Sequence, residues 1–318
     1  MPAPSSNESG SPSASSPSGP AGGTGAVAMG ALRWGDGPRL PVAVSEVGVA
    51  LLGREVHVLG GYVHGQAHST THLVYDTVSG RWRRAAPLPA ALDHVGTVAL
   101  AGRLFAVGGY GSSGTPTTGV YAYDPATNRW SARAPLPVPR AAAVAVALGG
   151  RLHLVGGRTR DGDTGRLDVY DPATNRWGVA APMPTARDHA AAAVVDGVLH
   201  VAAGRPGGMT VHQAYDPRSG RWSTLAPLPS GRSSVAGASL GGRFLVIGGE
   251  DASEQRVYRD VDAYDPRTRR WTRLRPLPAG LQGIGAVAAG GRLLLPGGGP
   301  AAGGARQSDR LLVLSVGG

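Results

Sequence analysis

Short apolar runs separated by polar or glycine-rich stretches follow one another along the chain from about residue 30 onward. In one such stretch, apolar and β-branched residues fill positions 94–100 and 104–107, a third run ends at position 123, and Trp130 stands in a fourth. Runs of four to seven residues of this kind, bounded by Gly or Pro, are typical of β-strands. The pattern therefore predicts units of four short strands, the first strand of this unit beginning at His94.

The unit recurs along the chain. All six tryptophans are 45 to 49 residues apart, at positions 34, 82, 130, 177, 222 and 271. Each follows an Arg, and each is followed six residues later by Leu-Pro or Met-Pro. A fixed period of this length indicates a repeat architecture, in which every repeat is one structural unit.

Paired glycines and a Tyr-Asp dipeptide keep the same period. The glycine pairs begin at positions 60, 108, 156, 248 and 297, with Ala203-Gly204 as the one variant. The Tyr-Asp dipeptides begin at positions 75, 123, 170, 215 and 264, and four of the five continue into Pro, which suits a type I turn. Six units of four antiparallel strands predict an all-β, six-bladed β-propeller.

The order Gly-Gly, Tyr-Asp, Trp in a unit of about 48 residues resembles the kelch repeat, whose period is about 50 residues. The resemblance covers residues 31–316. It departs from the family pattern at Ala203, at Thr77 in place of a Pro, and at 313–315, where the last Tyr-Asp should fall. We expect the repeated Gly, Tyr and Trp residues to serve the framework, through backbone conformation and packing between blades.

The order of the motifs also predicts how the ring closes. Trp34 precedes the first glycine pair, and no Trp follows the last pair. The sixth blade, at about 282–315, should therefore borrow its outer strand from residues 31–36. Residues 1–29 are almost entirely Ser, Pro, Gly, Ala and Asn, and we expect this segment to be disordered. The predicted domains are thus a disordered segment at 1–29 and a propeller at 30–316.

Composition excludes several classes of function. The chain has no Cys, so disulfides, Cys-ligated metals and thiol nucleophiles are excluded, together with the galactose-oxidase type of kelch enzyme, which needs a Cys cross-linked to a Tyr beside copper. No run approaches 18 apolar residues, so no membrane-spanning helix or membrane partner is expected. The first residues lack the charged and apolar regions of a signal peptide, which favours a cytoplasmic location.

The net charge of +10 arises entirely from arginine, because the chain has no Lys. Such usage is typical of a GC-rich genome and favours a bacterial source. Eleven of the 31 arginines occupy repeat positions, six before Trp and five in a Gly-Arg turn between the first two strands. Rotation about the axis spreads these residues into a belt, whereas nucleic-acid binding calls for a one-sided stripe. We therefore expect no specific nucleic-acid partner.

Binding residues of a propeller are expected in the segment after each Leu-Pro, where the repeats differ. The kelch resemblance implies that an Arg here lines the ligand pocket, and the matching positions are Arg140, Arg187 and Arg232, against Val44, Leu92 and Leu281 in the other repeats. Beside this position stand Asp93-His94 and Asp188-His189. An arginine cluster suits a carboxylate or phosphate. The competing interpretation is that these arginines bond carbonyl groups of neighbouring blades.

Two further patterns carry less weight. Adjacent Asp and His suit acid–base chemistry, but neighbours in a strand face opposite sides. His64, His68 and His72 are four residues apart, a spacing that would align them on a helix, but the segment is a Gly-containing loop. We therefore expect no metal and no cofactor.

Two functions follow from this sequence. The first is a binding module, a monomer or weak dimer, whose arginine-lined funnel engages a small anionic molecule or an acidic peptide segment. The alternative is a cofactor-independent isomerase, mutarotase, cyclase or lyase acting on a small anionic metabolite in the same funnel, similar to the six-bladed bacterial sialic-acid mutarotases. In the alternative, His94 or His189 would move protons. No catalytic motif identifies a nucleophile, so the catalytic residues stay unassigned.

Overall fold

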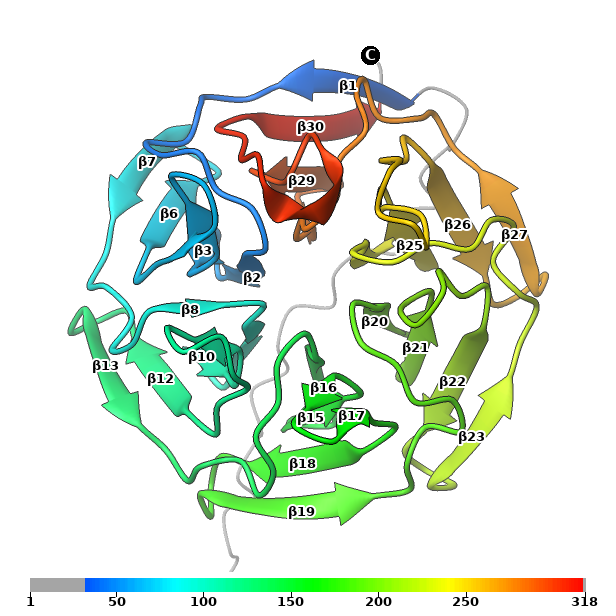
Figure 1. Ribbon diagram of the computed structural model, residues 1–318, viewed down its shortest axis with the longest axis horizontal. Coiled ribbons are helices and arrows are strands. Elements are labelled where there is room, and N and C mark those ends of the chain that lie inside the picture. Colours follow the sequence, from blue (N-terminus) through cyan, green and yellow to red (C-terminus); the bar gives the residue numbers. More distant parts are fainter. Residues whose placement is uncertain (1–31, 317–318) are drawn as a thin grey trace, which may run out of the picture.

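The computed structural model describes residues 32–316, which form six four-stranded antiparallel sheets arranged around a central axis (Figure 1). In each of the first five blades, the order of the strands in the sheet is their order in the sequence, from the axis outward. The first strand therefore lines the centre and the last lies at the rim. This confirms the prediction of an all-β, six-bladed propeller. The predicted disordered segment at 1–29 lies outside the described residues.

The strands of the six blades have nearly equal lengths. Blade 1 consists of β2 (Gly48–Leu52), β3 (Glu55–Leu59), β6 (His72–Asp76) and β7 (Arg81–Arg84). Blade 2 consists of β9 (Gly96–Leu100), β10 (Arg103–Val107), β12 (Val120–Asp124) and β13 (Arg129–Ala132). Blade 3 consists of β14 (Val144–Leu148), β15 (Arg151–Val155), β18 (Leu167–Asp171) and β19 (Arg176–Ala180).

The other three blades repeat this plan. Blade 4 consists of β20 (Ala191–Val195), β21 (Val198–Ala202), β22 (His212–Asp216) and β23 (Arg221–Thr224). Blade 5 consists of β24 (Ala236–Leu240), β25 (Arg243–Ile247), β26 (Val261–Asp265) and β27 (Arg270–Arg273). Blade 6 consists of β28 (Val287–Ala289), β29 (Arg292–Pro296), β30 (Leu311–Val316) and β1 (Leu32–Asp36).

Short elements lie in the loops that follow the glycine pairs, except β8, which lies in the segment leading into blade 2. These are β4 (Tyr62–Val63) with β5 (Ala67–His68), β8 (Leu92–Asp93) with β11 (Tyr110–Gly111), β16 (Arg158–Thr159) with β17 (Gly162–Asp163), and the 3₁₀ turn η2 (Ala302–Gly304). Among the described residues, no helix is long and apolar enough to cross a membrane.

The ring closes as the order of the motifs predicted. Strand β1 pairs antiparallel with β30, from Leu32 opposite Val316 to Asp36 opposite Leu312. The two ends of the propeller therefore meet in one sheet, with β1 as its outer strand (Figure 1). The seam carries an ion pair as well, because Arg310 Nη2 lies 2.8 Å from Asp36 Oδ1.

Each tryptophan links its blade to the blade before it. The indole Nε1 of Trp130 in β13 donates to Ala86 O at 2.9 Å, in the segment that leaves blade 1. The other five tryptophans donate to equivalent carbonyl groups: Trp34 to Arg275, Trp82 to Pro38, Trp177 to Ala134, Trp222 to Ala181 and Trp271 to Ala226. Six equivalent links account for the recurrence of Trp once in every repeat and give these residues a framework role.

The hydrophobic core lies between blades. Every cluster of buried apolar residues combines two neighbouring blades, for example Phe105 and Val120 of blade 2 with Leu152 and Leu154 of blade 3. The glycine pairs permit this close approach. Gly108 has φ +62°, and a Cβ there would lie 2.2 Å from Arg140 O of the next blade. The core therefore depends on the closed ring, since a single blade has no core of its own.

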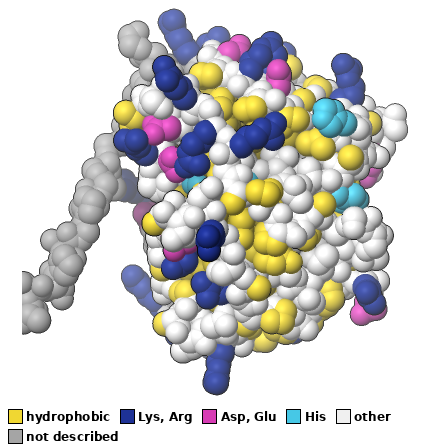
Figure 2. Space-filling model, turned by 90° about the vertical axis from the view of Figure 1, so that its left-hand side faces the viewer, with side chains coloured by type: hydrophobic (Ala, Val, Ile, Leu, Met, Phe, Trp, Pro, Cys, Tyr) yellow, Lys and Arg dark blue, Asp and Glu magenta, His cyan; other side chains and the backbone are white. Residues whose placement is uncertain are grey.

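Four of the eleven arginines of the belt form ion pairs inside their own blades. Arginines of the Gly-Arg turns contact the Asp of the Tyr-Asp motif in the same blade, at 2.9 to 3.6 Å: Arg54 with Asp76, Arg103 with Asp124, Arg151 with Asp171 and Arg243 with Asp265. Figure 2 shows the arginines spread over one side of the molecule rather than gathered into a single patch.

Candidate functional site

A closed ring of main-chain hydrogen bonds surrounds the axis. One residue of each repeat takes part, namely the residue two positions after Arg140 or after its counterpart in another repeat. Its N–H donates to the carbonyl of the equivalent residue in the neighbouring blade. Around the ring, Glu46 donates to Gly283, Gly283 to Ser234, Ser234 to His189, His189 to Ala142, Ala142 to His94 and His94 to Glu46, at 2.7 to 3.1 Å. We call these six residues the axial ring.

All six residues of the axial ring have a left-handed backbone. Their φ values lie between +49° and +55°. Five of the six are not glycine, although this conformation costs an L-residue roughly 1–2 kcal/mol. It turns the chain sharply before each inner strand and directs the side chains toward the axis. His94 therefore precedes β9, which begins at Gly96, and the prediction of a strand starting at His94 is wrong by two residues.

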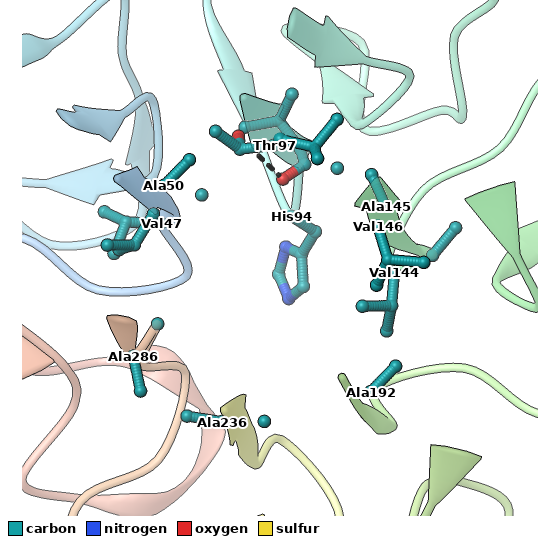
Figure 3. Close-up of a pocket in the computed structure, with 18 of the residues that line it drawn as sticks. Val47, Ala50, His94, Thr97, Val144, Ala145, Val146, Ala192, Ala236 and Ala286 are labelled. Atoms are coloured by element: carbon teal, nitrogen blue, oxygen red, sulfur yellow. Dashed lines mark hydrogen bonds between the residues drawn. The ribbon is translucent and has the colours of Figure 1, made fainter. Parts of the chain in front are cut away.

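A cavity of about 390 Å³ extends from the axial ring along the inner strands of blades 1 to 5 and the segment that precedes β28 in blade 6. Its wall is made mainly of small apolar residues, and Figure 3 shows Ala50, Val144, Ala192 and Ala236 around the opening into which His94 projects. Among the described residues that line it, only Glu46, His94 and His189 are ionisable, and all three belong to the axial ring. The cavity thus has an apolar wall and one charged end.

Glu46, His94 and His189 meet across the axis. The ligand atoms they offer all lie within 4.8 Å of one another, and His94 Nε2 is 3.0 Å from Glu46 Oε2. The two imidazole rings stand edge to face, with centroids 4.8 Å apart. Gly283 makes room for the carboxylate, because a Cβ there would lie 2.2 Å from Glu46 Oε1. We call Glu46, His94 and His189 the axial cluster.

A buried carboxylate stands behind each histidine. His94 Nδ1 bonds Asp93 Oδ1, and His189 Nδ1 lies 2.9 Å from Asp188 Oδ1. Both Asp side chains are buried. The expectation that strand alternation would separate Asp from His is therefore wrong, because the left-handed histidine breaks the alternation.

Charge at the cluster shifts the pKa values of its members. Burial opposes the charged form of His94, but Glu46 and Asp93 outweigh it and raise the pKa of His94 to about 10. Burial likewise opposes ionisation of Glu46, yet His94 holds the pKa of that carboxyl below its ordinary value. The pKa of Asp188 is lowered too, because His189 and Arg205 outweigh burial. Glu46 and His94 therefore form a buried ion pair.

Aromatic and charged groups surround the cluster on the side of the loops that follow the glycine pairs, which we call the loop side. The rings of Tyr62 and Tyr110 stand edge to face with His94, at 5.7 and 5.4 Å between centroids. Burial and nearby carboxylates, Asp188 first, raise the pKa of Tyr110 to about 12. Arg205 Nη2 lies 2.6 Å from Glu250 Oε1, which also accepts a hydrogen bond from Ser234 of the axial ring at 2.8 Å. Both tyrosines therefore stay neutral near pH 7.

The three arginines expected to line the funnel lie inside the blades instead. Arg140, Arg187 and Arg232 expose at most 1% of their surface, and none lines the cavity. The guanidinium of Arg140 pairs with Asp168, that of Arg232 pairs with Asp262, and Arg187 Nη2 donates to Gln213 Oε1 at 2.8 Å. Further bonds run to main-chain carbonyls within the same blades, such as Arg232 Nε to Gly248 O at 2.8 Å. The prediction that these three arginines line the funnel is therefore corrected: their side chains are framework groups inside the blades.

Of the seven predicted site residues, the structure brings His94 and His189 together on the axis, with Asp93 and Asp188 directly behind them. Sequence reasoning missed Glu46 as a member of the site. The signal that could have found it is its repeat position, which matches that of His94 and His189. The three histidines of the 64–72 loop do not meet, because His64 is exposed, His68 contacts Asp93, and His72 pairs with His57 inside blade 1.

Fold and repeats together define a six-bladed β-propeller built from kelch units. The sequence model of the KLHDC2/KLHL20/DRC7 Kelch-repeats domain matches residues 46–227, and the model of the Kelch motif matches residues 231–278. The chain therefore belongs to the kelch-repeat family. No curated protein gives a significant match.

Solved structures show the same fold. The structure titled "Structure of YjhT" superposes with a TM-score of 0.77 at 18% sequence identity, covering 88% of this chain and 97% of that chain. At this level of identity, the likeness concerns the fold alone.

Proposed function

We propose that this kelch propeller binds a small anionic molecule in its central cavity, with the anionic group at the axial cluster and the remainder along the apolar wall. The observation that carries the proposal is the segregation of the lining, in which the ionisable residues among those described all lie at one end. Ligand sites are mostly apolar cavities of about 300–1,000 Å³ with a few convergent polar groups. The cavity, at about 390 Å³, falls within that range.

The axial cluster supplies the polar contacts in this proposal. His94 already bonds Asp93 and Glu46 through its two ring nitrogens, so the imidazole of His189 is the direct donor to the anion, and the charge of His94 lies beside it. Arg205 stands close to the ring, 3.5 Å from Ser234 Oγ, but its charge is paired with Glu250 and Glu254. An acidic peptide segment would have to reach the same groups from the loop side, so we favour a small molecule over a peptide.

A thermal-shift screen of the full chain against small carboxylates, sugar acids and phosphate esters tests the proposal. A ligand at a hundredfold excess over its Kd adds about 2.7 kcal/mol to the free energy of unfolding, which is readily measured. We expect a hit to lose its shift in both His189→Gln and Glu46→Gln. The control His64→Gln, at an exposed loop residue, should keep the shift. If no anion raises the melting temperature, or if the shift survives both cluster variants, the proposal is wrong.

Acid–base catalysis is the second candidate function. It is favoured by the Glu46–His94 pair at 3.0 Å, a donor and acceptor at the end of a ligand-sized cavity. The enzyme would be an isomerase, mutarotase, cyclase or lyase acting on the bound anion. Incubating each screening hit with the protein, followed by NMR of the small molecule, separates the two. Conversion that stops in His94→Gln while binding persists indicates an enzyme, whereas an unchanged spectrum leaves a binding module.

A further inference from the structure

We infer that the axial cluster is a binding site for a divalent transition metal, held by Glu46, His94 and His189. The inference goes beyond the proposed function, because a metal would bind with or without an organic ligand. Two imidazoles and one carboxylate form a donor set that suits Zn²⁺, Fe²⁺, Co²⁺ and Mn²⁺. Zinc sites built from two His and one Glu keep a position open for water or substrate.

The geometry of the cluster is close to that of a metal site. Ligand atoms about 2.0–2.1 Å from a tetrahedral metal lie roughly 3.3 Å from one another. His94 Nε2 and Glu46 Oε2, at 3.0 Å, already have such a separation, and the whole set lies within 4.8 Å. Binding therefore requires that His189 move toward the other two residues and that the metal displace the proton on His94 Nε2.

The groups behind the histidines point to the same conclusion. Metal-ligating histidines commonly direct their second ring nitrogen at a carboxylate, which orients the ring and raises its basicity. His94 Nδ1 bonds Asp93, so its Nε2 is left to face Glu46 and the axis. His189 Nδ1 lies 2.9 Å from Asp188 Oδ1. The same Asp-His dipeptide thus occupies the same repeat position in blades 2 and 4.

Unsatisfied polar atoms supply a second, independent observation. His189 Nδ1 and Asp188 Oδ1 are both buried, and despite their separation neither makes a hydrogen bond with another described residue. Buried polar groups without a partner are costly, so a device that brings these two atoms into a good hydrogen bond would be stabilising. A metal that drew the His189 ring toward Glu46 would allow the ring to realign on Asp188.

Charge completes the argument. Glu46, Asp93 and Asp188 place three buried carboxylates around two imidazoles, and the arginines expected to balance an anionic ligand are enclosed in their blades. A divalent cation would offset the carboxylates.

Metal titration of the full-length protein tests the inference. Protein treated with EDTA and dialysed into metal-free buffer is titrated with CoCl₂, followed by visible absorption, and with ZnSO₄, followed by calorimetry. We expect one metal ion per chain and the intense visible bands of Co²⁺ in a four- or five-coordinate site. Glu46→Gln, His94→Gln and His189→Gln should each weaken binding at least about 100-fold, and Asp93→Asn about 10- to 100-fold.

Two controls match these variants. Ser234→Ala changes a ring position that is not a proposed ligand, and His64→Gln removes an exposed histidine; both should bind Co²⁺ like the parent. Melting temperatures of the metal-free variants show that each is folded. If the parent protein binds no Co²⁺ or Zn²⁺, or if binding survives all three ligand substitutions, the inference is overturned. Failure of metal binding would leave anion binding standing, and metal binding without any anion hit would overturn only the proposed function.

Discussion

Arg232 Nη2 donates to Asp262 Oδ2 at 2.7 Å, and neither side chain reaches solvent. The pair joins the segment that enters blade 5 to the third strand of the same blade. Blade 6 has Leu281 and Leu312 at the equivalent positions, so an apolar pair can replace an ionic one. Other blades also have either a polar or an apolar pair at these positions. Blade 3 has Arg140 with Asp168, and blade 4 has Arg187 with Gln213. Blade 1 has the apolar pair Val44 and Leu73.

This relationship makes a prediction for a double-mutant cycle. Arg232→Leu alone should destabilise the protein by at most about 3–5 kcal/mol, because it leaves the buried carboxylate of Asp262 with Arg273 as its remaining charged partner. The double variant Arg232→Leu/Asp262→Leu, which copies blade 6, should be more stable than either single variant. Urea unfolding of the four proteins measures this. Additive losses in the double variant would contradict the equivalence of the two kinds of pair.

The seam predicts a sharp difference between two truncations. Deleting residues 1–40 removes β1 and Trp34, and so the outer strand of blade 6 and the bond from Trp34 Nε1 to Arg275 O. The ring loses its closure, and its melting temperature should fall strongly. Deleting residues 1–28 leaves β1 in place and should change the melting temperature little. Equal melting temperatures for the two truncations would show that β1 does not close the ring.

Buried histidine pairs predict a loss of stability in acid. In blade 1, His57 Nδ1 and His72 Nε2 are 2.9 Å apart, and burial lowers their pKa values to about 3 and about 4. In blade 4, burial lowers the pKa of His200 to about 4 and that of His212 to about 3. These residues stay neutral in the folded chain, whereas the unfolded chain takes up protons below about pH 6.5.

The free energy of unfolding should therefore fall as the pH drops from 6.5 toward 4, by at most about 1.4 kcal/mol per pH unit for each histidine. The variant His200→Leu/His212→Val copies Leu245 and Val261 of blade 5 and should reduce this slope. Guanidinium unfolding at a series of pH values gives both slopes. An unchanged slope in the variant would assign the acid sensitivity to other groups.

Gly283 predicts a functional effect from a minimal substitution. Ala142 adopts φ +51° on the same ring, so an Ala at Gly283, where φ is +55°, has a backbone precedent in this molecule. Its Cβ would nevertheless lie 2.2 Å from Glu46 Oε1 and would push the carboxylate away from His94. Gly283→Ala should weaken Co²⁺ binding at least about 10-fold, since even displaced second-shell groups have effects of that size.

Gly53→Ala is the matched control, because Gly53 has φ +62° and open space around its Cβ position. Both variants should lose similar stability, roughly 1–2 kcal/mol from backbone strain. Only Gly283→Ala should alter metal binding. Equal Co²⁺ binding by both variants would mean that the position of the Glu46 carboxylate does not depend on the absence of a Cβ at Gly283.

The fold could be predicted from the sequence because every local signal occurs about six times. The position of Trp34 ahead of the first glycine pair was sufficient to predict the seam, which depends only on the order of motifs. The candidate site was less accessible, because it depends on where side chains point. Arg140, Arg187 and Arg232 were predicted to line the axis, but they lie inside the blades, and the residue two positions after each of them reaches the axis.

The left-handed ring residues are the physical reason for that error. Alternation along an extended strand assigns His94 and Asp93 to opposite faces, but φ +49° at His94 brings the two side chains together. Glu46 went unrecognised because its neighbours Ser45 and Val47 show no Asp-His motif. A comparison of the repeats identifies the buried arginines and the axial residues. Each of the three arginines occurs in a repeat with Asp or Gln on the third strand, and the residue two positions after the arginine reaches the axis.

The backbone of the axial ring is held independently of the side chains that the ring carries. Its six hydrogen bonds use only main-chain N–H and carbonyl groups, and the residues at its corners range from Gly283 to His189 with nearly the same φ. Because no side chain is needed to hold the ring, each corner can be exchanged separately without rebuilding the scaffold. A propeller of this kind can therefore acquire a new specificity by single substitutions at six known positions, which makes the ring a natural starting point for redesign.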